Sequence, residues 1–420
     1  MIQLIIIADD FTGGLDTGVQ FAARGIRTRV VTDPETDYMQ AADGCEVLVI
    51  VAETRHLPAR QAYDLVYRVV KKSREIGIPH IYKKTDSGLR GNIGAELTAA
   101  LEASGEKRLT FLPSMPGNGR VTVRGVHYIN GVPVNESVFG KDPFEPVTEA
   151  NVARLIALQS DVPVWNAAPD MIPDRDGITV VDAETDDDLR MAGERMAAGG
   201  RLNVTAGCAG FAAVLPALLG LEIREKPVMP RMERGLFVLC GSVNPITQRQ
   251  LDYAEKNGFT RLHIRPDQKL TRGYFDTAAG SEAIENWRRM NRETAWLILD
   301  ANDTDNRNTD SLDYATERGM STEDMRSCIS GALGAILTRM LESREKKSML
   351  ITGGDTLLQC MNQMGVTQME PLLEVYPGVV LSIFTVGDNT RYVITKSGGF
   401  GQETLLRDLK ELIESQQHNG

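Results

Sequence analysis

Two carboxylates stand directly after the first apolar run of the chain. Residues 4–8 read LIIIA, Asp9 and Asp10 follow, and a turn with the paired glycines Gly13 and Gly14 comes next. A carboxylate at the end of a buried strand can hold a sugar hydroxyl, take a proton or bind magnesium. It can equally cap the helix that follows. We predict that Asp10 holds a substrate hydroxyl and that Asp9 is a structural neighbour.

A second polar cluster lies in the segment YKKTDSGLRGN, residues 82–92. It combines cationic, carboxylate, hydroxyl and amide side chains at the end of a predicted strand, which suits a small anion with several hydroxyls, such as a hydroxy acid. A surface turn with weak local ion pairs is the alternative. Arg55 stands at the end of another apolar run, residues 46–52. The candidate residues of the cluster are Lys83, Lys84, Asp86, Ser87, Arg90 and Asn92.

The second half of the chain repeats one unit three times: an apolar run, a turn of small residues and a helix-length segment. The turns lie in LFVLCGSVNPITQ, SMLITGGDTLLQ and RYVITKSGGFGQE. Glycine lets a backbone approach a ligand closely, and the N–H groups that begin a helix attract phosphate. Because the carboxyl ends of parallel strands share one sheet edge, the three turns can converge on one anion. Thr356, Lys396 and Ser397 add two hydroxyls and a cation.

Short Val-, Ile- and Leu-rich runs alternate with helix-length segments from end to end, as in parallel sheets covered by helices. We predict an α/β fold of two domains, each a mainly parallel sheet flanked by helices, with a cleft between them. At 420 residues the chain exceeds the usual size of a single core. Two prolines and a charged run precede the strand GLFVLC, which places the boundary near Pro230 and the domains at 1–230 and 231–420.

Three local features complete the predicted organisation. Residues 113–146 are rich in Gly, Pro and Asn and predict a long excursion or hairpin. Helices are expected over 59–77 and 327–347, and the acidic patch at 186–188 is expected to open a helix. Neither a P-loop motif, GxxxxGK[ST], nor a GxGxxG after the first strand occurs, so no Walker-type or dinucleotide-binding site is predicted.

Composition narrows the function classes. The formal net charge of −11 argues against a nucleic-acid or anionic-membrane partner, because no bulk positive field exists to drive such binding. The apolar runs are strand-sized, and no basic stretch precedes the first of them, so we expect no membrane span, no signal peptide and a cytoplasmic location. Five scattered cysteines form no CxxC motif, which predicts buried thiols in a reducing compartment. The composition leaves a homo-oligomer open.

Six segments, in order along the chain, resemble the signatures of the four-carbon acid sugar kinases. They are ADDFTGGLDTGVQFAARG, KKTDSGLRGNIGAEL, PSMPGNGRVTVRGVHYINGVPVNES with DPFEPV, CGSVNPITQRQL, TGGDT and KSGGFG. The resemblance spans nearly the whole chain. It implies an ATP-dependent kinase that phosphorylates the terminal 4-hydroxyl of a four-carbon sugar acid, with Mg²⁺ expected beside the nucleotide. It also implies an N-terminal substrate domain and a C-terminal nucleotide domain, with the sugar acid and ATP as the partners.

The same resemblance implies roles for individual residues. Asp10 and Asp86 are the candidates for orienting or deprotonating the attacking hydroxyl. At one position the chain departs from its relatives, which usually have Thr where this sequence has Gly88. The substrate-binding candidates are Asp10, Arg55, Lys84, Thr85, Asp86 and Ser87, with Arg90 and Asn92 of the same cluster. The ATP-binding candidates are Ser242, Gly353, Gly354, Asp355, Thr356, Gly398 and Gly399.

The substrate is the least determined part of this interpretation. The opening DFTGGLDTGVQ is more similar to members acting on D-threonate than to those acting on 3-oxo-tetronates, and D-erythronate stays open as an acceptor. The alternative from another class is a non-catalytic sensor that closes on a sugar acid and a nucleotide. Phosphorylated product distinguishes the two.

Overall fold

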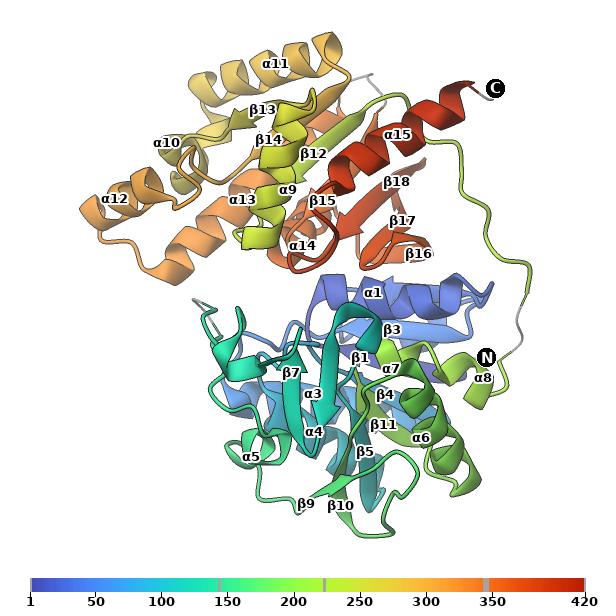
Figure 1. Cartoon of the computed structure of the whole chain (residues 1–420). Helices are drawn as coiled ribbons and strands as arrows, with labels where there is room; N and C mark the ends of the chain where they lie inside the picture. The colour runs from blue at the N-terminus through green and yellow to red at the C-terminus, as the bar shows by residue number, and fades with distance from the viewer. Residues whose placement is uncertain (1, 143–144, 222–223, 343–346, 419–420) are drawn as a thin grey trace. The chain divides into compact units, whose positions relative to one another are not determined.

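The computed structural model describes residues 2–142, 145–221, 224–342 and 347–418 (Figure 1). It divides into two compact units, Met1–Pro227 and Val228–Gly420, and the strands within each unit pair in a mainly parallel order. The division follows Pro227, close to the boundary predicted at Pro230. No helix among the described residues is long and apolar enough to cross a membrane.

The sheet of the first unit is parallel throughout, with strand order β2-β3-β1-β4-β11-β5-β10-β9. Its central strand β1 is buried at every position, as the run LIIIA predicts. In its register Ala8 lies beside Val51 of β3 and Lys84 of β4, so the residues after these strands emerge at one edge. The strands are β1 (Leu4–Ala8), β2 (Thr28–Val31), β3 (Val47–Val51), β4 (His80–Lys84), β5 (Arg108–Leu112), β9 (Val164–Ala167), β10 (Gly177–Val181) and β11 (Val204–Gly207).

Helices cover this sheet because alternate side chains of each strand point to opposite faces. Ile5 and Ile7 share a core cluster with Val66 of α3 and Leu97 of α4, while α1 packs on the other face, where Gly14 lies against Val49 and Val51. Each fully buried Ile, Leu or Val contributes about 1.5–3 kcal/mol. The helices are α1 (Phe11–Ala22), α2 (Tyr38–Ala41), α3 (Ala59–Glu75), α4 (Ile93–Ser104), α5 (Val152–Ala157), α6 (Asp186–Ala198), α7 (Ala209–Ala212) and α8 (Leu215–Leu218).

The predicted excursion at 113–146 contains a small antiparallel sheet of β6 (Arg120–Val123), β7 (Val126–Ile129) and β8 (Val132–Pro133). Residues 143–144 of this stretch lie outside the described residues. The acidic patch at 186–188 does open a helix, α6, where Thr185 and Asp188 form a capping box.

The sheet of the second unit has the order β13-β14-β12-β15-β18-β17-β16. It is parallel from β13 to β18. The strands are β12 (Leu236–Cys240), β13 (Thr260–His263), β14 (Trp296–Asp300), β15 (Ser348–Thr352), β16 (Gln368–Tyr376), β17 (Val379–Val386) and β18 (Asn389–Lys396). The helices are α9 (Pro245–Lys256), α10 (Pro266–Leu270), α11 (Ala278–Glu293), α12 (Thr309–Glu317), α13 (Thr322–Leu341), α14 (Gly354–Gln363) and α15 (Leu405–His418).

The second sheet ends in an antiparallel meander of β16, β17 and β18 that the sequence prediction did not include. Two-residue connections join these strands at Pro377–Gly378 and Gly387–Asp388, and both glycines have positive φ. Connections this short can join only antiparallel neighbours. The helix predicted over 327–347 begins earlier, at Thr322, and residues 343–346 lie outside the described residues.

Candidate functional site

Arg55 and the two N-terminal carboxylates meet at the carboxyl edge of the first sheet. Arg55 follows β3, and its Nε donates to Asp9 Oδ2 at 2.9 Å while Nη1 donates to Asp10 Oδ2 at 3.0 Å. Its Nη2 lies 2.7 Å from Asp9 Oδ2 and 2.8 Å from Asp10 Oδ1. The parallel register of β1 and β3 creates this contact between residues far apart in the sequence. The guanidinium is therefore already neutralised by protein carboxylates.

Asp10 is the N-cap of α1. Its Oδ1 accepts from the Gly13 N–H at 3.0 Å and its Oδ2 accepts from the Thr12 hydroxyl at 2.9 Å. Together with Arg55, these contacts engage both carboxylate oxygens within the protein. The capping role that the sequence left open for either carboxylate thus belongs to Asp10.

Asp9 keeps an unused acceptor. Its Oδ1 is buried, and no donor among the described residues forms a hydrogen bond to it. Burial opposes ionisation, but the charges of Arg55, Lys84 and Lys83 outweigh it and lower the pKa of Asp9. A buried acceptor without a donor costs about 1–3 kcal/mol, which a ligand hydroxyl at this oxygen would recover. The structure thus leaves Asp9 with an oxygen that can accept a hydrogen bond from a ligand, whereas the sequence analysis predicted only a structural neighbour.

Lys84 supplies a buried cation next to that acceptor. Its side chain is 4% exposed, and Nζ lies 3.7 Å from Asp9 Oδ1, beyond hydrogen-bonding distance. A Cβ at Gly13 would lie 2.6 Å from Nζ, so the glycine makes room for the ammonium. Burial opposes the charge, but Asp9 and Asp10 outweigh it and raise the pKa of Lys84. Within the described residues no atom accepts a hydrogen bond from this ammonium, in contrast to the neighbouring Lys83, which pairs with Glu96 at 2.8 Å.

Asp86 and Arg90 form a bidentate pair in the loop between β4 and α4. Arg90 Nε donates to Asp86 Oδ2 at 2.9 Å and Nη2 donates to Oδ1 at 3.0 Å, while Nη1 reaches Asp142 at 3.1 Å. Arg55 Nη2 lies 3.6 Å from Asp86 Oδ1, which joins the two predicted clusters. Burial favours the neutral acid, but Arg90 and Arg55 hold the pKa of Asp86 well below its usual range.

Gly88 faces an aromatic ring. A Cβ at this position would lie 2.5 Å from Cδ1 of Phe139, and the Arg90 guanidinium lies 5.1 Å from the centre of the same ring. Phe139 thus occupies the space in which a larger side chain at position 88 would begin. The glycine at position 88 therefore fits the Phe139 ring, which belongs to the excursion at 113–146.

The other candidates of this cluster differ in what they offer. Thr85 has a buried hydroxyl without a partner among the described residues, and the Ser87 carbonyl accepts from His127 Nε2 at 3.0 Å. The Asn92 amide donates to the Thr54 and Leu57 carbonyls at 2.9 and 2.8 Å, so it holds the loop after β3. Asn92 is therefore committed to the loop that carries Arg55.

The three glycine turns of the second unit converge on one edge of its sheet. In the register of adjacent strands, Cys240 of β12 lies beside Thr352 of β15, which lies beside Lys396 of β18. The residues that follow these strand ends are therefore neighbours. A Cβ at Gly398 would lie 2.7 Å from Ser242 Oγ, and one at Gly241 would collide with Thr356 Oγ1.

The turn between β15 and α14 leaves backbone donors available. Gly353 is the N-cap with φ 110, and no side chain caps the helix. The first N–H groups of such a helix have no intrahelical acceptor and carry partial positive charge. Asp355, which lies in this first turn, is held by Arg326 of α13 through bonds of 2.7 and 3.0 Å. Arg326 thus partly compensates a negative charge where an anion would bind.

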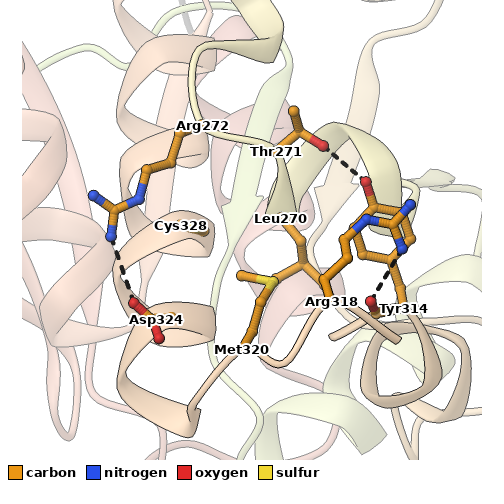
Figure 2. A pocket seen from close by; sticks show the side chains of 8 residues that line it. All are labelled: Leu270, Thr271, Arg272, Tyr314, Arg318, Met320, Asp324 and Cys328. Atoms are coloured by element: carbon orange, nitrogen blue, oxygen red, sulfur yellow. Dashed lines mark hydrogen bonds and ion pairs between the residues drawn. The ribbon is translucent and has the colours of Figure 1, made fainter. Parts of the chain in front are cut away.

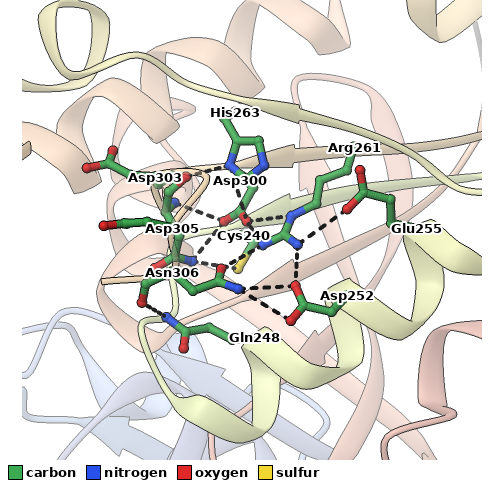
Figure 3. Close-up of polar contacts among 12 residues, drawn as sticks. Cys240, Gln248, Asp252, Glu255, Arg261, His263, Asp300, Asp303, Asp305 and Asn306 are labelled. Atoms are coloured by element: carbon green, nitrogen blue, oxygen red, sulfur yellow. Dashed lines mark hydrogen bonds and ion pairs between the residues drawn. The ribbon is translucent and has the colours of Figure 1, made fainter. Parts of the chain in front are cut away.

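A network of polar side chains beside these turns fixes the loop after β14 (Figure 3). Arg261 Nη2 donates to the fully buried Asp300 at 2.6 Å, and Arg261 Nη1 donates to Asp252 of α9 at 2.6 Å. Asn302 donates to Asp300 at 2.8 Å and to the Ser242 carbonyl at 3.1 Å. The network therefore reaches the first glycine turn and fixes the position of Ser242.

A cavity of about 470 Å³ lies elsewhere in this unit, among α10, α12 and α13 (Figure 2). Thr271 and Tyr314 are hydrogen-bonded across it at 2.9 Å, and the Arg318 guanidinium lies 3.5 Å from the centre of the Tyr314 ring. None of the sequence-predicted site residues lines it. Its position does not coincide with either polar centre described above.

Comparisons with known proteins follow the same division of the chain. The family model described as "Sugar-binding N-terminal domain" matches residues 4–215, and the one described as "Nucleotide-binding C-terminal domain" matches residues 237–406. A D-threonate kinase of Salmonella typhimurium is 30% identical over 98% of this chain and 99% of its own length.

The chain belongs to the four-carbon acid sugar kinase family. It is a phosphotransferase with an alcohol group as acceptor, and it uses ATP and a small sugar acid. The alternative of a non-catalytic sensor is therefore not retained.

Other relatives of the kinase carry different substrate names. A D-erythronate kinase of Heliobacterium modesticaldum is 27% identical over 90% of this chain and 89% of its own, and a 3-oxo-tetronate kinase of Pseudomonas fluorescens is 26% identical over 94% and 93%. Among solved structures, a protein of Salmonella typhimurium LT2 superimposes with a TM-score of 0.75 at 20% identity, covering 98% of this chain and all of its own. A Haemophilus influenzae protein gives 0.69 at 21% identity, covering 97% and 100%. These two structures confirm the α/β fold.

Three neighbours of the candidate residues in the kinase were not predicted from the sequence. Asp142 holds Arg90, Phe139 faces Gly88, and Arg326 holds Asp355. Each lies in a loop or helix remote from its partner and outside any motif of fixed spacing. The segment DPFEPV, part of the resemblance, contains Asp142 and was the one signal available for it.

Proposed function

We propose that this kinase is a D-threonate 4-kinase, which transfers the γ-phosphoryl group of ATP to the terminal 4-hydroxyl of D-threonate. The observation that carries the proposal is the buried ammonium of Lys84, which has no hydrogen-bond acceptor among the described residues and lies 3.7 Å from the unsatisfied Asp9 Oδ1. A sugar acid brings a carboxylate for the cation and hydroxyls for the acceptor. The D-threonate kinase name of the relative at 30% identity favours this acid.

In the proposed site, the first unit binds the acid. The Lys84 ammonium attracts the carboxylate of the acid. The free oxygen of Asp9 accepts a hydrogen bond from one hydroxyl of the acid, and the Thr85 hydroxyl forms a hydrogen bond with another. Ser87 and Arg90 border the same loop. Arg55 contributes mainly by fixing Asp9, Asp10 and Asp86, because its donors already engage those carboxylates. Asn92 supports the loop that carries Arg55.

Asp10 and Asp86 are proposed to orient the reacting groups. Phosphoryl transfer proceeds through a loose transition state, so positioning and charge neutralisation supply most of the rate enhancement. The low pKa of Asp86, caused by Arg90 and Arg55 against the effect of burial, makes it a weak base. Orientation of the 4-hydroxyl therefore agrees better with its surroundings than proton removal in the ground state.

The second unit is proposed to bind ATP at the glycine turns. Gly353, Gly354 and the N–H groups of Asp355 and Thr356 face the phosphates, and the turn at Gly398 and Gly399 closes against Ser242. Mg²⁺ belongs to this proposal as the counter-ion of the phosphates. Among the described residues, no three His, Cys, Asp or Glu side chains group as metal ligands.

D-Erythronate and 3-oxo-tetronate stay as second candidates, because kinases with those names are 27% and 26% identical to this chain. A coupled assay of ADP release with D-threonate, D-erythronate and 3-oxo-tetronate separates the three. We expect the highest kcat/KM with D-threonate. If another acid gives a higher kcat/KM, that acid replaces D-threonate as the proposed substrate. No turnover with any of the three acids would refute the proposed kinase site.

The role of Lys84 is tested by Lys84→Met, with Lys71→Met on the exposed face of α3 as the control. A hydrogen bond to a charged group contributes about 1.5–3 kcal/mol, so we expect KM for D-threonate to rise about 10- to 100-fold. KM for ATP should change little, whereas the thermal unfolding temperature should fall, because the substitution removes a buried cation that Asp9 and Asp10 stabilise. An unchanged KM for the acid in Lys84→Met would remove Lys84 from the binding site.

A further inference from the structure

Lys396 is a buried cation at the nucleotide turns whose hydrogen-bond acceptors are all uncharged. It is the last residue of β18 and is 2% exposed. Its Nζ donates to Thr247 Oγ1 at 2.9 Å, to the Ser397 carbonyl at 3.0 Å and to the Gly398 carbonyl at 3.2 Å. Three N–H groups thus meet three oxygens, which fixes the direction of the side chain.

The electrostatic surroundings of Lys396 lack an anion. Among the described residues, no carboxylate forms an ion pair with it, and the titratable group that faces it is Cys240 of β12. Burial and the nearby charge of Asp300 raise the pKa of Cys240 well above its usual value, so this neighbour is a neutral thiol. Arg261 also acts on Cys240 and pairs with Asp300. Burial accordingly lowers the pKa of Lys396 to about 7.

Hydrogen bonds connect the same lysine to the proposed phosphate site. Thr247, in the first turn of α9, donates to the Gly398 carbonyl at 3.1 Å and accepts from Ser242 Oγ at 3.3 Å. Lys396 therefore joins the loop after β18, the first turn of α9 and Ser242. A phosphate bound at these turns would be the anion that the buried ammonium lacks.

We propose that Lys396 couples nucleotide binding to the uptake of one proton. In the free protein Nζ exchanges between an ammonium, which donates all three hydrogen bonds, and a neutral amine, which has only two N–H groups to donate. The bound phosphates hold it as the ammonium; the proton comes from the solvent, and no covalent bond to phosphorus changes. The inference rests on the proposed nucleotide role of the second unit. It adds a residue outside the predicted ATP-binding set and an electrostatic role that a purely structural lysine does not have.

Proton uptake by Lys396 makes ADP binding weaker as the pH rises above the pKa of the free protein. Below pH 7 the ammonium is already present and nucleotide binding takes up little proton. Above pH 7 the free protein has lost this proton, so binding must restore it, and Kd for ADP should rise by up to about tenfold per pH unit until the pKa of the complex is reached. At pH 8 the expected uptake is between about half a proton and one proton per ADP bound.

The test is titration calorimetry of ADP with Mg²⁺ into the full-length protein at pH 8, repeated in Tris, Tricine and HEPES. Because these buffers differ in ionisation enthalpy, the slope of the observed enthalpy against it counts the protons exchanged. We expect an uptake of between about half a proton and one proton in the unmodified protein. Saturable ADP binding with a slope of zero would overturn the inference and leave the nucleotide site intact.

Two variants test whether Lys396 is the group that takes up the proton. Lys396→Met removes the titrating group, and Lys396→Arg keeps a permanent charge at the same place, so both should bind ADP without proton uptake at pH 8. Lys256→Met, at the exposed end of α9, is the matched control and should keep the uptake. Uptake that persists in either Lys396 variant would overturn the assignment. If the protein binds no ADP by calorimetry or equilibrium dialysis, the proposed function of the second unit fails, and this inference fails with it.

Discussion

At the scale of single residues, the first unit has two carboxylates with both oxygens engaged and one, Asp9, with a single oxygen engaged. Asp10 and Asp86 are engaged by a helix N-terminus, Arg55 and Arg90, whereas Asp9 retains a buried oxygen without a donor among the described residues. Charge type alone, which is what the sequence provides, does not distinguish these roles. The distinction comes from which donors the fold brings within reach.

Asp86→Asn tests the orienting role of that carboxylate. The amide cannot accept both Arg90 hydrogen bonds and also lacks the charge that Arg55 faces, so the loop between β4 and α4 should shift. A displacement of about 1 Å at a reacting group can cost about 100-fold in rate, and we expect a loss in kcat of that order. Steady-state kinetics with D-threonate measures it. A kcat within twofold of the unmodified enzyme would remove Asp86 from the mechanism.

Gly88 and Phe139 should behave as a compensating pair. Gly88→Thr drives a side chain into the Phe139 ring, and overpacking of this kind costs about 1–3 kcal/mol. We expect a lower unfolding temperature and a lower kcat/KM for D-threonate. Adding Phe139→Ala should recover part of both losses, giving a favourable coupling energy in a double-mutant cycle. Strictly additive effects would show that the ring does not determine which residue fits at position 88.

At the scale of elements, strands and turns place every group of the two polar centres. In each unit the parallel register of three neighbouring strands brings their following residues to one edge, which is what sequence periodicity and glycine turns predicted. The predicted strand positions and the opening of α6 are confirmed for the same reason: local apolar runs and capping residues act within a few positions.

What the sequence could not predict depends on contacts between distant segments. The PG and GD pairs at the two short connections signal the antiparallel meander, and the sequence prediction did not use them. β16 itself contains Pro371 and two glutamates, Glu370 and Glu374, that obscure its strand pattern. The partners Asp142 and Arg326 reach their targets only in the folded chain. The open oxygen of Asp9 could not be predicted either, because the capping bonds of its neighbour Asp10 form only in the folded chain.

Gly353→Ala tests the turn that begins α14. The residue has φ 110 and a Cβ there would lie 3.1 Å from Thr356 Oγ1, so alanine should strain the turn by about 1–3 kcal/mol and misalign the backbone donors. We expect KM for ATP to rise at least about tenfold with little change in KM for D-threonate. Gly365→Ala, which has φ 66 but no atom within 4 Å of its Cβ, is the control. Equal effects of the two substitutions on KM for ATP would contradict the assignment of this turn.

At the scale of the whole molecule, the chain divides its chemistry between two compact units. One contains the proposed acid-binding cluster of Asp9, Lys84 and Thr85, and the other contains glycine turns beside Ser242 and Lys396. Neither cluster alone accounts for a kinase, because phosphoryl transfer needs an alcohol acceptor and a triphosphate donor. The family models named for sugar binding and nucleotide binding follow the same division.

The central claim is that the kinase phosphorylates the terminal hydroxyl of D-threonate, and phosphorus NMR of the reaction mixture tests it most directly. Carbon 4 of D-threonate is a methylene, so the phosphorus of a 4-phosphate couples to the two protons on that carbon. Its phosphomonoester signal is therefore triplet-like. We predict that this signal grows with ADP when the protein is incubated with D-threonate and Mg-ATP. A doublet, from phosphate on carbon 2 or 3, or the absence of any new phosphomonoester would contradict the account.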